Sequence, residues 1–102
     1  MFREVEKLKL KEPADVKLYI LTLMNYVDLP LKYSQINDIV LQDDFVSNYD
    51  FIDQFEELKK AGFVKNTEGD MYEITPSGEF IARTLKGDIS GYVRENGIRH
   101  AM

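Results

Sequence analysis

The sequence contains no cysteine, no tryptophan and a single histidine among its 102 residues. Without cysteine the chain can form neither a disulfide framework nor a thiolate nucleophile, which is usual for a protein of a reducing compartment. No apolar run approaches the roughly 20 residues that cross a bilayer. Charges also interrupt the first residues, where a secretory signal would need an apolar core. We therefore expect a cytoplasmic protein with no membrane contact.

A catalytic constellation is missing as well. His100 stands near the end of the chain with no partner at an evident spacing. Ser77 lacks the glycine two positions before it that a nucleophile elbow requires. Asp43 and Asp44 are adjacent carboxylates without further oxygen ligands at loop spacing, and the glycines are too scattered to cradle a phosphate. We therefore expect no enzyme activity, no metal and no cofactor.

The composition is that of an ordinary folded domain. Hydrophobic residues make up 44% of the chain and charged residues 30%. We expect a single domain over 1–102, with a core at about 13–86 and helical extensions at 1–12 and 87–102. The net charge is −5, and residues 18–61 carry three basic against eight acidic side chains. This balance argues against non-specific binding to nucleic acid or to anionic lipid.

Apolar spacing and chain breakers predict the elements of the core. Apolar residues three and four positions apart indicate helices, and short β-branched or aromatic runs bounded by polar residues indicate strands. The predicted helices cover about 13–28, 34–41, 48–61 and 76–86. The predicted strands cover about 63–65 and 71–74, with a hairpin loop at 66–70 and a short extended link at 31–33.

Capping residues fix several of these boundaries. Pro13 suits the first turn of the first core helix, where its missing N–H has no partner to lose. Ser47 and Asp50 have the spacing of a capping box. Gly62 can take the left-handed conformation that ends a helix, and Thr75, which precedes a proline, is a good first cap for the last core helix.

The aromatic residues divide into expected core and open cases. We expect the apolar face of the third core helix to consist of Phe51, Ile52, Phe55 and Leu58. Phe63 and Phe80 also fall on inward faces of their elements. For Tyr19, Tyr26, Tyr33 and Tyr92 the sequence leaves edge packing, an effector pocket and a dimer contact as alternatives.

Two local phrases resemble bacterial regulators of the winged-helix class. The run from Leu58 to Val64 is similar to the junction where their third helix ends in glycine and enters the wing. The run from Tyr72 to Glu79 is similar to their exit from the wing. Together with Asp28 to Leu31 and Ser34 to Ile36, the resemblance covers about residues 14–86. It is to the PadR-like and MarR-like superfamily, closest to an uncharacterised family of short winged-helix proteins.

The resemblance implies an α+β, mostly helical fold. That fold is a winged helix-turn-helix with a two-stranded wing and flanking N- and C-terminal helices. The family's usual role implies a DNA-binding transcriptional regulator whose third helix enters the major groove. The groups expected nearest the bases are Ser47, Asn48, Tyr49 and Gln54. The groups expected at phosphates are Lys32, Lys59, Lys60 and Lys65.

The charge of the third helix favours a different hypothesis. Its outward face carries Asp53, Glu56 and Glu57, with Asp50 at the flank and Lys60 as the single cation. Carboxylates are repelled by the negatively charged phosphates of nucleic acid. The alternative is therefore a winged-helix protein-interaction module that uses these four carboxylates and does not bind DNA. Because the resemblance is to regulators, the DNA-binding regulator is our first hypothesis and the interaction module is the alternative.

Apolar stripes near both ends predict a homodimer. The stripes contain Phe2, Val5 and Leu8 at one end, and Ile81, Leu85, Ile89, Tyr92 and Val93 at the other. Such stripes must be buried somewhere. Packing against the chain's own core is the alternative.

Overall fold

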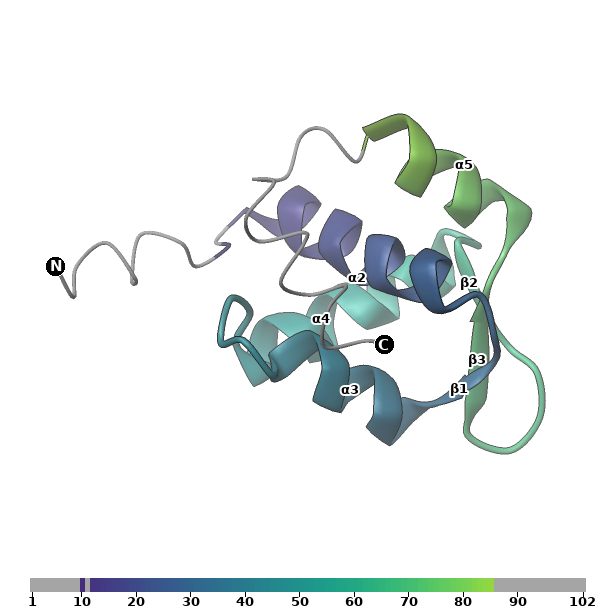
Figure 1. The fold of residues 1–102 in the computed structure, drawn as a ribbon, viewed down its shortest axis with the longest axis horizontal. Helices are drawn as coiled ribbons and strands as arrows, with labels where there is room; N and C mark the ends of the chain where they lie inside the picture. Colours follow the sequence, from purple (N-terminus) through teal and green to yellow (C-terminus); the bar gives the residue numbers. More distant parts are fainter. Residues whose placement is uncertain (1–9, 11, 86–102) are drawn as a thin grey trace, which may run out of the picture.

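The structure is a computed structural model, and it describes residue 10 and residues 12–85. The described part is α+β and mostly helical, with four helices and a three-stranded antiparallel sheet. In chain order the elements are α2 (Pro13–Val27), β1 (Leu31–Lys32), α3 (Tyr33–Leu41), α4 (Asn48–Lys60), β2 (Val64–Asn66), β3 (Met71–Ile74) and α5 (Pro76–Leu85) (Figure 1). The helical extensions expected at 1–12 and 87–102 lie almost wholly outside the described residues.

Helix α2 lies between α5 on one side and the α3–α4 pair on the other, with the sheet near its C-terminal end (Figure 1). Almost every side chain from Val16 to Met24 is therefore buried. Pro13 stands at the start of the helix, as predicted. The helix ends at Asp28, whose left-handed backbone (φ 57°) turns the chain and whose N–H donates to the Met24 carbonyl. A short aspartate side chain tolerates this conformation better than most residues.

The predicted extended link at 31–33 contributes a third strand. Leu31 pairs with Tyr72 and Lys32 with Met71, which places β3 at the centre of a sheet of order β1-β3-β2. On its other edge β3 pairs with β2, where Val64 faces Ile74. The two-stranded hairpin expected from the sequence is thus extended by β1. Its loop end is tied to the start of α3, because the Tyr33 N–H donates to the Asp70 carbonyl at 2.9 Å.

Capping residues place both ends of α4 and the start of α5 where the sequence predicts them. The Ser47 hydroxyl accepts the Asp50 N–H at 3.1 Å, which is one half of the expected capping box. Gly62 follows α4 with a left-handed φ of 82°. The Thr75 hydroxyl donates to the Gly62 carbonyl at 2.7 Å and accepts the Gly78 N–H at 3.2 Å. One side chain therefore joins the end of α4 to the first turn of α5.

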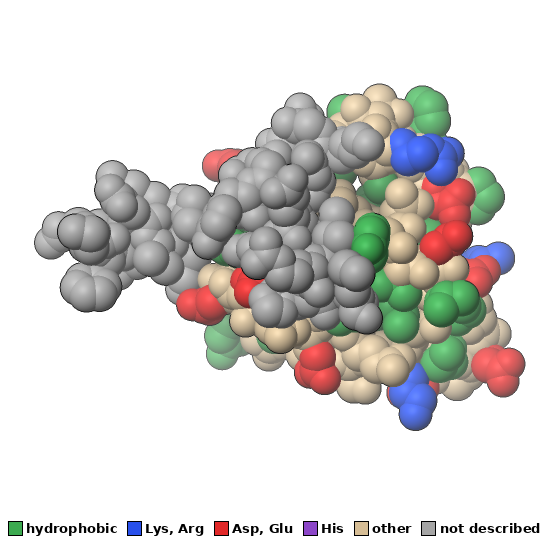
Figure 2. Space-filling model, in the orientation of Figure 1, with side chains coloured by type: hydrophobic (Ala, Val, Ile, Leu, Met, Phe, Trp, Pro, Cys, Tyr) green, Lys and Arg blue, Asp and Glu red, His purple; other side chains and the backbone are tan. Residues whose placement is uncertain are grey.

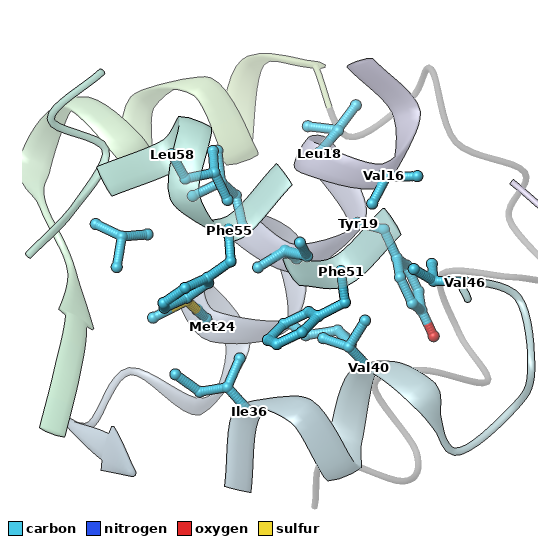
Figure 3. Close-up of a cluster of buried hydrophobic side chains, with 14 of the residues drawn as sticks. Val16, Leu18, Tyr19, Met24, Ile36, Val40, Val46, Phe51, Phe55 and Leu58 are labelled. Atoms are coloured by element: carbon cyan, nitrogen blue, oxygen red, sulfur yellow. The ribbon is translucent and has the colours of Figure 1, made fainter. Parts of the chain in front are cut away.

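The core centres on aromatic side chains of α4. Phe51 and Phe55 are fully buried and stack on one another, with ring centroids 5.4 Å apart. Figure 3 shows both rings directed toward Met24 of α2 and Ile36 of α3. Tyr33 and Tyr72 complete the cluster by edge contacts with Phe55 at 5.4 and 5.2 Å. This arrangement orients α4 relative to both α3 and the sheet.

Tyr19 is also a core residue, which decides one of the open cases. Its side chain is fully buried and meets the Phe45 ring edge-on, with centroids 6.2 Å apart. Its hydroxyl points toward the segment that contains Val46 (Figure 3). Burial raises the pKa of this phenol above its ordinary value, and the charge of Asp43 acts in the same direction. The hydroxyl therefore stays protonated.

Two expected core residues face solvent instead. Phe80 is 61% exposed, because α5 packs against its neighbours through the small residues Gly78 and Ala82, one turn apart, which turns Phe80 outward. Ile52 is 41% exposed, because the buried face of α4 is narrower than predicted and consists of Phe51, Phe55 and Leu58.

Candidate interaction surface on helix α4 and the hairpin

The outward face of α4 combines exposed apolar side chains with carboxylates. Tyr49, in the first turn, is 82% exposed, and Ile52 lies one turn further along the helix. Asp53, Glu56 and Glu57 continue this face toward the C-terminal end and are all exposed, and Asp50 is partly buried at its flank. We call these six residues the α4 face.

The polar residues expected nearest DNA bases are partly engaged within the domain. Ser47 caps α4. The Asn48 side-chain carbonyl accepts a hydrogen bond from the Asn37 amide at 3.2 Å, which links α3 to α4. Gln54 is only partly exposed, and its Oε1 is buried without a hydrogen-bond partner among the described residues. Of the four predicted base-reading groups, Tyr49 alone presents its whole side chain to solvent.

The ammonium group of Lys59 is engaged in contacts within the domain. Its Nζ lies 2.7 Å from Glu56 Oε2 and stands 5.7 Å from the Phe55 ring centre and 5.4 Å from that of Tyr72. The hydrogen bond to Glu56 raises the pKa of Lys59 above its ordinary value, so the ammonium remains charged. Lys59 therefore joins α4 to strand β3 rather than extending freely toward a ligand.

The other three lysines predicted to contact phosphates differ in whether they have an ion-pair partner within the domain. Lys65 on β2 pairs with Glu73 on β3 at 3.2 Å. Lys32 on β1 and Lys60 at the end of α4 are exposed and have no ion-pair partner within the described part of the chain. Around the tip of the hairpin, Glu68 and Asp70 are exposed on either side of Gly69. Carboxylates thus outnumber free cations on both α4 and the hairpin.

A comparison with protein families shows the family to which the chain belongs. The model of the family described as a domain of unknown function, DUF4364, matches residues 16–101. The chain belongs to the DUF4364 family. No curated protein and no solved structure matches the chain. The match agrees with the expectation that the chain belongs to a family of unassigned role. The description of that family carries no statement about a winged helix.

The face of the DUF4364 domain that Figure 2 shows combines apolar and charged side chains. Figure 2 shows hydrophobic side chains gathered near the end of α2 and the sheet, with acidic and basic side chains dispersed among them. The basic side chains on this view stand apart from one another and form no continuous stripe over the described residues. Tyr26 and Leu29, at the end of α2, are among the exposed large hydrophobic residues of the domain.

The sequence predicts the outward position of Tyr49, as a group near DNA bases, but it does not predict the exposure of Ile52, which it places in the core. The signal that could have separated Ile52 from the core is its angular position, since Phe51, Phe55 and Leu58 already define one narrow stripe.

Two broader findings concern the described residues as a whole. No described helix is both long enough and apolar enough to cross a membrane. Within residue 10 and residues 12–85, no three His, Cys, Asp or Glu side chains come together as a group that could hold a metal ion.

The stripes that predict a homodimer lie mostly outside these residues, and only Ile81 and Leu85 fall within them.

Proposed function

We propose that this DUF4364 domain is a winged helix whose α4 face binds a protein partner with a basic surface. In this assignment α3 and α4 are the helix-turn-helix and the β2–β3 hairpin is the wing. The order of helices and strands supports the winged-helix assignment. The choice of a protein partner rests on the chemistry of the α4 face.

The observation that carries the proposal is the exposure of Tyr49 beside Ile52 on an acidic helix. A tyrosine that is 82% exposed offers a large, stiff side chain with a polar tip. Tyrosine is enriched among the residues that dominate binding energy at protein interfaces. Ile52 adds an apolar contact on the next turn. Ile52 offers nothing to a phosphate, and Tyr49 offers only one uncharged hydroxyl donor.

The charges of the α4 face support the same partner class. Asp53 and Glu57 are exposed, and neither has an ion-pair partner among the residues that the structure describes. Such carboxylates attract a basic protein and speed its association at low salt. They repel the phosphates of nucleic acid. The partner's surface is therefore expected to carry lysine or arginine around an apolar contact.

The proposal predicts different effects for charge and for Tyr49. We expect Asp53→Asn/Glu57→Gln to slow association with the partner, chiefly at low salt, because steering depends on unscreened charge. We expect Tyr49→Ala to speed dissociation and to weaken binding about tenfold, the effect of one well-buried contact residue. Partners are captured from a native extract, identified, purified and then measured by biolayer interferometry.

A matched control separates the α4 face from net charge. Glu68→Gln/Asp70→Asn removes the same two kinds of carboxylate from the tip of the hairpin. This control should leave association with the partner close to that of the wild type. Equal slowing by the two double variants would contradict a role for the α4 face.

DNA binding is a second candidate, favoured by the element order and by the exposed Lys32 and Lys60. The decisive variant is again Asp53→Asn/Glu57→Gln, because removing carboxylates should strengthen binding to DNA while it weakens binding to a basic protein. Lys60→Ala should weaken binding to all DNA sequences alike, and Asn48→Ala should alter sequence preference. Electrophoretic mobility shifts at about 50 mM salt, where phosphate contacts are strong, measure all four proteins. Absence of any shift for the wild type at that salt would exclude this candidate.

A further inference from the structure

The first described residue, Leu10, lies beside the segment that leads into α4. Its N–H donates to the Phe45 carbonyl oxygen at 2.7 Å, and its side chain packs against the core. Phe45 is buried and stands four residues before Tyr49, so the Cα atoms of these two residues are no more than about 14 Å apart. Residues 1–9 are therefore attached to the domain close to the apolar end of the α4 face.

The sequence of residues 1–9 complements the α4 face in charge and in apolar character. In an extended run, successive side chains fall on alternate sides. One side would then carry all three cations of the segment together with an apolar residue, namely Arg3, Val5, Lys7 and Lys9. Both acidic residues, Glu4 and Glu6, would fall on the other side. Cations around an apolar contact are the chemistry expected of a partner of the α4 face.

The length of the segment is also sufficient. Nine residues span at most about 30 Å when extended, whereas the 13 residues of α4 form a helix about 20 Å long. A segment attached beside the start of α4 can therefore reach Glu57, at the far end of the α4 face. Because the segment belongs to the same chain, its effective concentration at the α4 face is high. A contact too weak to hold two separate molecules together would still be populated.

We propose that residues 1–9 dock on the α4 face of their own chain. Val5 packs on Tyr49 and Ile52, and the three cations of the segment pair with the carboxylates of the face. The docked segment occupies the surface that the basic partner needs, so the partner binds only by displacing it. This regulation rests on the proposed function, whereas the docking itself requires no partner and is measured without one.

Paramagnetic NMR on the whole chain tests the docking. The chain contains no cysteine, so Phe2→Cys allows a single nitroxide label at position 2. At low salt we expect this label to weaken the amide signals of residues 49–57 strongly. The signals of α5, which lies on the other side of α2 (Figure 1), should keep their intensity. The loss should fade toward about 1 M salt, where the Debye length is only about 3 Å.

Two variants and a mixing experiment locate the contact. Asp53→Asn/Glu57→Gln should remove most of the signal loss, and the hairpin control Glu68→Gln/Asp70→Asn should retain it. Full intensity at residues 49–57 in the labelled protein at low salt would overturn the proposal, and so would an equal loss in the two double variants. We expect no loss when spin-labelled protein is mixed with isotope-labelled protein that carries no spin label. A loss in that mixture would show that the segment docks on another copy and would overturn docking within one chain.

The regulation is tested with the partner of the α4 face. Arg3→Gln/Lys7→Gln/Lys9→Gln should bind the partner more tightly than the wild type, because a binding site that is covered part of the time has a lower apparent affinity. The control Lys17→Gln/Lys65→Gln/Arg83→Gln removes three cations from other parts of the chain and should give a smaller gain. Equal gains by the two triple variants would overturn the regulation. Docking of the segment without binding of any basic protein would instead contradict the proposed function.

Discussion

Phe55→Ala is expected to lower the free energy of unfolding by about 3–5 kcal/mol, the cost of removing a large aromatic side chain from a packed core. Phe55 is fully buried and contacts the rings of Phe51, Tyr33 and Tyr72. Because domains of this size have a total stability of about 5–15 kcal/mol, the variant should lose a large share of it. Urea unfolding followed by circular dichroism measures the change.

Phe80→Ala is the matched control for this prediction. It removes the same atoms from a side chain that is 61% exposed on α5, so the free energy of unfolding should change by no more than about 0.5 kcal/mol. A similar loss for the two variants would contradict the position of Phe55 at the centre of the core.

Gly78→Ala is expected to destabilise the domain, although alanine normally favours a helix over glycine by about 1 kcal/mol. Gly78 is buried in the first turn of α5. A Cβ at this position would collide with the Phe63 carbonyl oxygen and would lie 2.7 Å from Ile74 Cγ1. The Phe63 carbonyl cannot move freely, because it also accepts the Thr75 N–H at 3.0 Å.

We expect this overpacking to cost about 1–3 kcal/mol. At about 4–8 °C per kcal/mol for a domain of this size, the melting temperature should fall visibly in a thermal scan. Ser77→Ala, at the exposed neighbouring position of the same helix, should leave it unchanged or raise it slightly. A rise in melting temperature for Gly78→Ala would disprove the close approach of α5 to the hairpin.

Sequence reasoning succeeded where a boundary depends on local chemistry. The bounds of α4 follow from the Ser47 cap and the left-handed Gly62, and the start of α5 follows from Thr75. Each of these features is settled by the few residues around it. The hairpin and the order of helices were predicted for the same reason.

The errors arose where packing at long range decides. Phe80 belongs to a helix with the right period, but the close approach of α5 leaves room only for small residues such as Gly78 and Ala82 on the inward face. The pairing of Leu31 with Tyr72 joins distant parts of the chain, and no local pattern in a two-residue strand specifies it.

The candidate surface was predicted in its charge but not in its shape. Asp53, Glu56 and Glu57 fall outward because the helical period alone places them there. The engagement of Asn48 by Asn37 and of Lys59 by Glu56 and two aromatic rings depends on neighbouring elements. The apolar cavity of about 220 Å³ between α2, α4 and α5 requires three helices in position at once, so no local pattern in the sequence predicts it.

The two edges of strand β3 are expected to pair at different stages of folding. Its pairing with β2 closes a short loop, and hairpins of this kind form in about 1–10 μs. Its pairing with β1 joins Leu31 to Tyr72, far along the chain, and so closes a much longer loop at a higher entropic cost. We therefore expect β1 to dock late, after the main barrier. Damage to β1 would then shorten the lifetime of the folded state and leave the speed of reaching it almost unchanged.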